Sequence, residues 1–118
     1  MPKVLIVEDE ADEARSMQMV LEKAKFDVEL ASDGKEALEK AMNVDAVVLD
    51  IILPRIHGDV VLKEMRAKNI KTPVVIVTAV SRSIGVEDDL KKIDSSIFFL
   101  QKPFTPEQLV KAVKNQLK

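Results

Sequence analysis

The sequence predicts an α/β protein in which a five-stranded parallel sheet is covered on both faces by five helices. Short apolar runs alternate along the chain with longer segments of helical periodicity, which is typical of repeated β-α units. Four of the five runs are unbroken and rich in β-branched or aromatic residues, as expected for strands buried on both faces. A chain of 118 residues can form one domain with its own core, and we expect that domain to span residues 1–118.

Five apolar runs give the predicted strands. The second run alternates polar and apolar residues, so we expect this strand at an edge of the sheet. The other four have no polar interruption, which suits strands that helices cover on both sides. The predicted strands are residues 4–7, 28–31, 46–49, 74–77 and 97–100.

Helical segments lie between these strands. Residues 11–24 carry an apolar stripe at spacings of three and four residues, which predicts an amphipathic helix. Asp33 followed by Glu36 is a start signal for a second helix, and a third is expected to begin near Gly58. The apolar residues assigned to the three helices are Ala14, Met17, Leu21 and Ala24, then Ala37, Leu38 and Ala41, then Val61, Leu62 and Met65.

The last helix has the clearest start signal of all. Thr105 is placed to cap it, Pro106 occupies the first helical position, and Gln108 completes a capping box. The fourth helix is the weakest prediction, because serine and glycine lower the helix propensity of residues 81–94.

The composition excludes several functional classes. With no cysteine and one histidine, the chain can form neither a disulfide framework nor a thiolate metal site, and a reducing, cytoplasmic setting is expected. No apolar run approaches the ~20 residues needed to cross a bilayer, and the N-terminus lacks the layout of a signal peptide. The net charge is -2, and Trp and Tyr are absent, so the basic and aromatic character of nucleic-acid binding is missing. We therefore expect neither nucleic acid nor membrane as a direct partner.

Polar side chains follow four of the predicted strands, and parallel strands bring their carboxyl ends to one edge of a sheet. Glu8 and Asp9 follow the first strand, Asp50 the third, Thr78 the fourth and Lys102 the fifth. Clustered carboxylates need a cation or a proton, and an oxygen-rich site of this kind suits Mg²⁺. A metal ion, a lysine and a hydroxyl are what phosphoryl transfer requires of a protein. Because no cysteine or nearby histidine is available, the nucleophile should be a carboxylate.

The acids after the first strand also have a simpler interpretation. Acidic side chains are favourable at the start of a helix, so Glu8 and Asp9 could belong to the helix that follows them. Glu10, Asp12 and Glu13 are interpreted in this way. For Glu8 and Asp9 both interpretations remain open.

Four short motifs resemble the receiver domain of bacterial response regulators, the CheY-like family. The match covers essentially the whole chain and is closest to the stand-alone, single-domain members. The motifs are Val7-Glu8-Asp9-Glu10, Asp50-Ile51-Ile52-Leu53-Pro54 followed by Gly58, Thr78-Ala79, and Lys102-Pro103-Phe104. The resemblance implies a flavodoxin-like fold with sheet order 2-1-3-4-5 and a phosphoprotein of two-component signal transduction.

The same resemblance implies a metal site and a phosphoacceptor. Asp50 would accept a phosphoryl group as an aspartyl phosphate. Asp9 and Asp50 would bind Mg²⁺ directly, and Glu8 directly or through water. The backbone carbonyl of Ile52 would complete the protein ligands. The chain would catalyse its own phosphorylation and dephosphorylation only, and in that sense is not expected to be an enzyme.

Three further residues receive implied roles in signalling. Lys102 would bind the phosphoryl oxygens, and its bond to Pro103 is expected to be cis. Thr78 would hydrogen-bond the phosphoryl group and move inward, and Phe99 would be the switch aromatic that fills the vacated space. Output would be a population shift in the region between Thr78 and Phe99, including the weak helix at residues 82–92.

The implied partners are proteins. The phosphoryl donor would be a phosphohistidine of a sensor histidine kinase or of a histidine phosphotransfer protein. The output would be binding of a downstream protein target, by a monomer or a phosphorylation-dependent dimer, unless the chain is cut from a longer regulator. The sequence does not reveal the kinase, the signal or the target.

Other functions fit the sequence less well. A haloacid-dehalogenase-type phosphatase needs a second aspartate two residues after the nucleophile, where this chain has Ile52. A flavodoxin-type FMN site is disfavoured because the acids from Glu8 to Glu13 would repel the phosphate and no Trp or Tyr could stack on the flavin. A degenerate receiver that acts as a constitutive docking module remains the alternative.

Two departures from the family pattern carry expectations of their own. Ile52 and Val80, two residues beyond Asp50 and Thr78, are branched and apolar and cannot orient a hydrolytic water, so we expect a long-lived phosphorylated state. The segment 94–96 replaces the Gly-Ala found in many receivers before the fifth strand, which leaves the geometry of that loop open.

Overall fold

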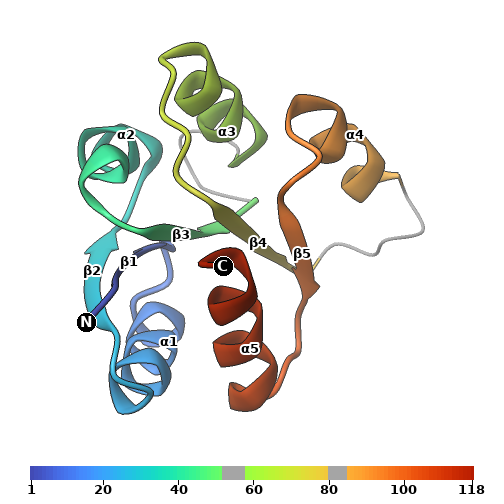
Figure 1. The fold of residues 1–118 in the computed structure, drawn as a ribbon. Coiled ribbons are helices and arrows are strands. Elements are labelled where there is room, and N and C mark those ends of the chain that lie inside the picture. The colour runs from blue at the N-terminus through green and yellow to red at the C-terminus, as the bar shows by residue number, and fades with distance from the viewer. Residues whose placement is uncertain (52–57, 80–84) are drawn as a thin grey trace.

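The structure is a computed structural model, and it describes residues 1–51, 58–79 and 85–118. Within these residues a five-stranded parallel sheet has the order β2-β1-β3-β4-β5, which confirms the predicted topology (Figure 1). The strands are β1 (Lys3–Val7), β2 (Asp27–Ala31), β3 (Ala46–Asp50), β4 (Val74–Thr78) and β5 (Phe98–Gln101). The helices are α1 (Ala11–Lys23), α2 (Gly34–Lys40), α3 (Gly58–Ala67), α4 (Val86–Ile93) and α5 (Pro106–Gln116), with a short 3-10 helix η1 (Ala41–Asn43) after α2.

The apolar runs of the sequence account for the strands. Every residue of β3 and β4 is buried, because helices cover both faces of the sheet there. One residue of β2, Ala31, is buried, and this strand lies at an edge of the sheet as its alternating pattern predicts. The polar residues Asp50, Thr78 and Gln101 extend β3, β4 and β5 by one position beyond the predicted runs.

The sheet separates two apolar cores, which alternate residues of each strand fill. Leu5 and Val7 face the core shared with α2, α3 and α4, whereas Val4 and Ile6 face the core shared with α1 and α5. Figure 1 shows this division, with α2, α3 and α4 on one side of the sheet and α1 and α5 on the other. Packing on both faces holds the strands in register, so their carboxyl ends lie along one edge. None of the helices in the described ranges is long and apolar enough to span a membrane.

Local capping signals set the starts of α2 and α5 as predicted. The Asp33 carboxylate accepts a hydrogen bond from the Glu36 N–H at 2.9 Å. Thr105 Oγ1 accepts from the Gln108 N–H at 3.1 Å, and Gln108 Oε1 accepts from the Thr105 N–H at 2.8 Å, which completes the capping box.

The fourth helix differs from the prediction at its N-terminal end. The sequence predicts a helix over residues 82–92, and α4 spans Val86–Ile93, while residues 82–84 lie outside the described part of the chain. Gly85 precedes the helix with φ of 80°, a left-handed conformation that glycine adopts at little cost. Among the described residues, no side chain caps this end of α4.

The segment before β5, where the family pattern is not followed, is held by side-chain hydrogen bonds. Asp94 Oδ1 accepts from the backbone N–H of Ser96 at 2.8 Å and from its hydroxyl at 2.6 Å. Asp94 Oδ2 accepts from Arg66 Nε of α3 at 2.6 Å. Burial alone raises the pKa of Asp94, but the hydrogen bonds from Ser96 and Arg66 outweigh it and lower the pKa below its usual value. The turn is therefore fixed without the glycine that many receivers carry.

Candidate functional site

The carboxyl ends of four strands bring the predicted site residues together. Glu8 and Asp9 directly follow β1, while Asp50 and Thr78 are the last residues of β3 and β4. Lys102 follows β5, and its backbone N–H donates to the Thr78 carbonyl at 2.7 Å, which extends the pairing of β4 and β5 by one step. The predicted constellation is thus assembled by strand register, since these residues are far apart in the sequence.

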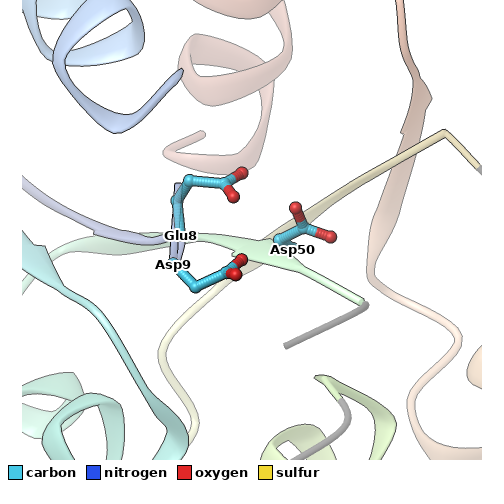
Figure 2. Close-up of side chains that lie close together, drawn as sticks. All are labelled: Glu8, Asp9 and Asp50. Atoms are coloured by element: carbon cyan, nitrogen blue, oxygen red, sulfur yellow. The ribbon is translucent and has the colours of Figure 1, made fainter. Parts of the chain in front are cut away.

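Three carboxylates form the centre of this site. One oxygen each from Glu8, Asp9 and Asp50 can be chosen so that all three lie within 4.8 Å of one another. Figure 2 shows the side chains of Glu8 and Asp9 extending from the end of β1 toward Asp50 at the end of β3. Glu8 and Asp50 are buried and Asp9 is exposed, so the site opens to solvent on the Asp9 side.

Lys102 is the cation of the site, and it contacts more carboxylates than the sequence predicts. Its Nζ lies 3.1 Å from Glu8 Oε2, 3.1 Å from Asp50 Oδ2 and 3.0 Å from Glu13 Oε2. An ammonium group has three donors, and here each has a carboxylate acceptor. Burial alone lowers the pKa of Lys102, but the hydrogen bonds to Glu13 and Asp50 and the charge of Asp50 outweigh it and raise the pKa above its usual value.

Glu8 is an acid of the site and does not begin the first helix. Glu10 is the N-cap of α1, and its carboxylate accepts from the N–H groups of Asp12 and Glu13. The Glu8 N–H instead donates to the Ala31 carbonyl of β2 at 3.0 Å, which continues the β1 ladder and directs the side chain to the strand ends. The interpretation of Glu8 as a helix-start acid is therefore wrong, because the N-cap of α1 is Glu10, two residues after Glu8.

The pKa of Glu8 is raised by its burial and by the neighbouring Asp50. Its carboxyl is buried, it is hydrogen-bonded to Asp50, and it feels the Asp50 charge, so its pKa is raised from 4.5 to about 8. The Glu10 N–H and Lys102 act in the opposite direction but do not cancel these effects. The hydrogen bond from Lys102 therefore only partly offsets the burial of Glu8 and the charge of Asp50 beside it.

A divalent cation of the hard, oxygen-preferring kind fits this donor set. Three carboxylate oxygens converge from two strand ends, and a cation among them would offset both the burial of Glu8 and the Asp50 charge beside it. Mg²⁺ binds such oxygens and keeps several coordination positions for water and phosphate. The Ile52 carbonyl, implied as a further ligand, lies outside the described residues, as does Val80.

Thr78 and Phe99 lie on one face of the sheet on neighbouring strands. Thr78 is fully buried, and Phe99 is 2% exposed in the core shared with α3 and α4. Phe99 pairs in register with Ile76, which lies two residues before Thr78 and so shares its face. Ala79, next to Thr78, is exposed, which leaves the site accessible from solvent.

Glu13 belongs to the site in a way that the sequence does not predict. The sequence favours a helix-start acid at this position, but the Glu13 carboxylate makes a direct ion pair with Lys102. The signal for this contact is weak in the sequence, because it depends on the first turn of α1 lying beside the end of β5. The proximity of Glu13 to the acidic pair after β1 is the available hint.

Comparisons with known proteins show the family to which the chain is similar. The profile of the response regulator receiver domain matches residues 4–114. Response regulator ArlR of Staphylococcus saprophyticus is 36% identical, over 100% of this chain and 53% of that protein. The alkaline phosphatase synthesis transcriptional regulatory protein PhoP of Bacillus subtilis is 35% identical, over 95% of this chain and 47% of that protein. The chain thus spans about half the length of these curated relatives.

Solved structures of similar length show the same fold. The chemotaxis protein CheY4 of Vibrio cholerae superposes with a TM-score of 0.90 at 31% identity, over 99% of both chains. The receiver domain of Francisella response regulator 1452 gives a TM-score of 0.86 at 32% identity, over 99% of this chain and 97% of that one. On the family match, the shared fold and these relatives, the chain belongs to the CheY-like receiver domains of two-component response regulators.

Proposed function

We propose that this receiver domain accepts a phosphoryl group on Asp50 and thereby switches its binding surface. The observation that carries the proposal is the position of Asp50. Asp50 is the last residue of β3, and one of its carboxylate oxygens lies within 4.8 Å of an oxygen of Glu8 and of Asp9. Its Oδ2 lies 3.1 Å from Lys102 Nζ. A nucleophilic oxygen, a site for a metal ion and a fixed ammonium group are thus in one place, as phosphoryl transfer requires.

Mg²⁺ is the proposed cofactor, held by Glu8, Asp9 and Asp50, with the Ile52 backbone carbonyl as the further ligand. The ion would supply charge neutralisation for the phosphoryl oxygens. The protein's own part is to fix these side chains through the strand ends and to hold Lys102 where the phosphoryl oxygens arrive. Thr78, buried at the end of β4, supplies the hydroxyl donor.

The proposed step is a transfer between two nucleophiles. An Asp50 oxygen uses a lone pair to form an O–P bond, while the N–P bond of a phosphohistidine breaks and leaves its electron pair on the imidazole nitrogen. Water then attacks the phosphorus of the resulting acyl phosphate, the O–P bond to Asp50 breaks with its electron pair left on the carboxylate, and the proton that the water loses passes to solvent as inorganic phosphate leaves. Lys102 and Thr78 stabilise the negative charge on the transferred phosphoryl group in both the phosphorylation and the hydrolysis step.

The switch would use the two buried residues that share a face of the sheet. A phosphoryl group on Asp50 draws the Thr78 hydroxyl toward it, and the Phe99 ring turns into the space that Thr78 leaves. The register of β4 with β5 supports this coupling, because Phe99 pairs with Ile76, two residues before Thr78. The equilibrium between two conformations of the region from Thr78 to Phe99, which includes α4, would then shift.

The proposed partners follow from the family. The phosphoryl donor is a sensor histidine kinase or a histidine phosphotransfer protein, and the output is binding of a downstream protein, with or without dimerisation. The relatives are about twice as long, and PhoP is named a transcriptional regulatory protein. If this chain is part of such a protein, the controlled partner is a DNA-binding segment of the same chain, and the receiver itself makes no nucleic-acid contact.

Mass spectrometry after incubation with acetyl phosphate and Mg²⁺ tests the proposal. The wild-type protein should gain one phosphoryl group, and Asp50→Ala should gain none, because the nucleophile is absent. Chelation of Mg²⁺ should also abolish the gain. Asp88→Asn, which removes an exposed carboxylate from α4, is the matched control and should be phosphorylated like the wild type. An unmodified wild-type protein would favour the constitutive docking module instead.

The lifetime of the phosphorylated state is a separate prediction that follows from the sequence around the site. Ile52 and Val80 offer no polar atom to orient water, so loss of the phosphoryl group in Mg²⁺ should be slower than in a rapid-cycling chemotaxis receiver. Val80→Gln supplies such an atom and should accelerate loss about tenfold or more. Decay of the wild-type protein as fast as the chemotaxis receiver measured alongside would contradict the prediction.

A further inference from the structure

Glu13 makes a contact with Lys102 that the proposed chemistry at Asp50 does not need. It belongs to the first turn of α1, and its Oε2 lies 3.0 Å from Lys102 Nζ, as close as either of the two site carboxylates. The two residues are 89 positions apart in the sequence, so the contact exists because the first turn of α1 lies beside the end of β5. Glu13 is not one of the three acids that converge on the metal position.

Structural roles for Glu13 are already filled by other residues. The N-cap of α1 is Glu10, whose carboxylate binds the N–H groups of Asp12 and Glu13. The Glu13 side chain is 50% exposed, and an ion pair with that much exposure contributes little to folding stability. Lys102 has two buried carboxylates as acceptors without it. The contact is therefore explained better by an effect on Lys102 than by an effect on the fold.

Glu13 acts on the group that receives the phosphoryl oxygens. Each of the three donors of Lys102 has an acceptor on an acidic side chain, Glu8, Asp50 or Glu13, so Glu13 occupies one of the three. An arriving phosphoryl donor is an anion, and each carboxylate charge near the site opposes its approach. Glu13 stands on the exposed side of the site, where it lines a hollow of about 550 Å³ together with Lys102 and Ala79.

We propose that Glu13 is a positioning residue that acts through Lys102 as an electrostatic brake on the phosphorylation of Asp50. In the unmodified protein it takes one of the three lysine donors and adds a negative charge on the solvent side of the site. When Asp50 is phosphorylated, Lys102 turns to the phosphoryl oxygens and its bond to Glu13 weakens. The inference rests on the proposed function of Asp50 and adds a control on its rate.

Glu13→Gln separates the charge of Glu13 from its ability to accept a hydrogen bond. The amide oxygen can still accept from Lys102, but the negative charge is lost. Phosphorylation by acetyl phosphate in saturating Mg²⁺ should become about threefold to tenfold faster at low salt, and the gain should shrink as added salt screens the charge. Phosphoramidate, which carries less negative charge than acetyl phosphate, should show a smaller gain. Asp12→Asn is the matched control, because Asp12 is exposed on the same turn while the ion pair with Lys102 is made by Glu13.

A second measurement does not depend on turnover. Beryllofluoride is an anionic phosphoryl mimic, and its binding in saturating Mg²⁺ can be followed by NMR or calorimetry. Glu13→Gln should bind it about threefold to tenfold more tightly than the wild type, and Asp12→Asn by a clearly smaller factor. Glu13→Ala removes the charge and the acceptor together, so it should gain rate and affinity as Glu13→Gln does.

The possible outcomes keep this inference distinct from the proposed function. If the wild type is phosphorylated on Asp50 but Glu13→Gln reacts no faster than Asp12→Asn, the proposed role of Glu13 is overturned. The proposal that Asp50 is the phosphoacceptor is then unaffected. Slower phosphorylation in Glu13→Ala with an unchanged rate in Glu13→Gln would also overturn the proposed role of Glu13, because the role would then be orientation of Lys102 by a hydrogen bond. Absence of phosphorylation in the wild type and in both variants would remove both proposals.

Discussion

Gly58→Ala is expected to destabilise the protein by about 2 to 4 kcal/mol, because no space exists for a β-carbon at this position. The Gly58 N–H donates to the Ile51 carbonyl at 2.6 Å, which brings the start of α3 against the end of β3. A β-carbon on residue 58 would lie 2.6 Å from Ile51 Cα and against the Asp50 carbonyl oxygen. Because the obstructing atoms are backbone, relief requires α3 to move away from the residue proposed as phosphoacceptor.

Urea unfolding of Gly58→Ala and Gly85→Ala measures this effect against a matched control. An added β-carbon at Gly85 meets nothing within 4 Å, and the cost there is the left-handed backbone alone, about 1 kcal/mol. We also expect Gly58→Ala to be phosphorylated on Asp50 more slowly at temperatures where it remains folded, because the displaced backbone includes Asp50. A loss of stability no larger than that of Gly85→Ala would contradict the predicted clash.

Glu8→Gln is expected to stabilise the metal-free protein at pH 8 and above by a few kcal/mol. The folded-state pKa of Glu8 is raised from 4.5 to about 8, so between these values the folded protein holds a proton that the unfolded chain has released. The free energy of unfolding of the wild type should therefore fall as the pH rises from 4.5 to about 8, by at most about 1.4 kcal/mol per pH unit. A glutamine has no proton to lose and avoids this cost.

Urea unfolding across this pH range, with and without Mg²⁺, checks the prediction. The fall in stability should be present in metal-free wild type, reduced by saturating Mg²⁺, and largely absent in Glu8→Gln. Asp9→Asn removes an exposed carboxylate from the same cluster and should keep most of the fall. Equal pH profiles of stability for the wild type and Glu8→Gln would show that loss of a proton from Glu8 does not cause the fall.

Local signals in the sequence predict most of the fold. The capping residues Asp33, Thr105 and Gln108 act within three or four residues of chain, so their hydrogen bonds can be recognised without knowing the tertiary structure. The same holds for the unbroken apolar runs that form β3 and β4. The predicted start of α4 is too early, since Gly85 adopts a left-handed conformation at its N-cap that composition alone does not reveal.

The sequence predicts those contacts of the candidate site that strand order determines. It does not predict the contact that depends on how a helix is placed. Asp50, Thr78 and Lys102 meet because parallel strands end at one edge, which follows from the β-α alternation. The contact of Glu13 with Lys102 depends instead on how the first turn of α1 is set against the end of β5. An acid in the first turn of a helix is explained by its favourable interaction with the helix dipole. The sequence therefore gives no reason to assign Glu13 a specific contact with Lys102.

The two ends of α4 differ in their side-chain contacts. At its C-terminal end, the turn after Ile93 is tied to α3 by Arg66, which binds both Asp94 and the Ile70 carbonyl, at 2.6 and 2.7 Å. At its N-terminal end, Gly85 offers no side-chain cap. If the proposed switch displaces α4, these contacts with Arg66 would hold its Asp94 end, and the helix would pivot about that end. On the proposed mechanism, the surface offered to a partner would then change most at the Gly85 end of α4.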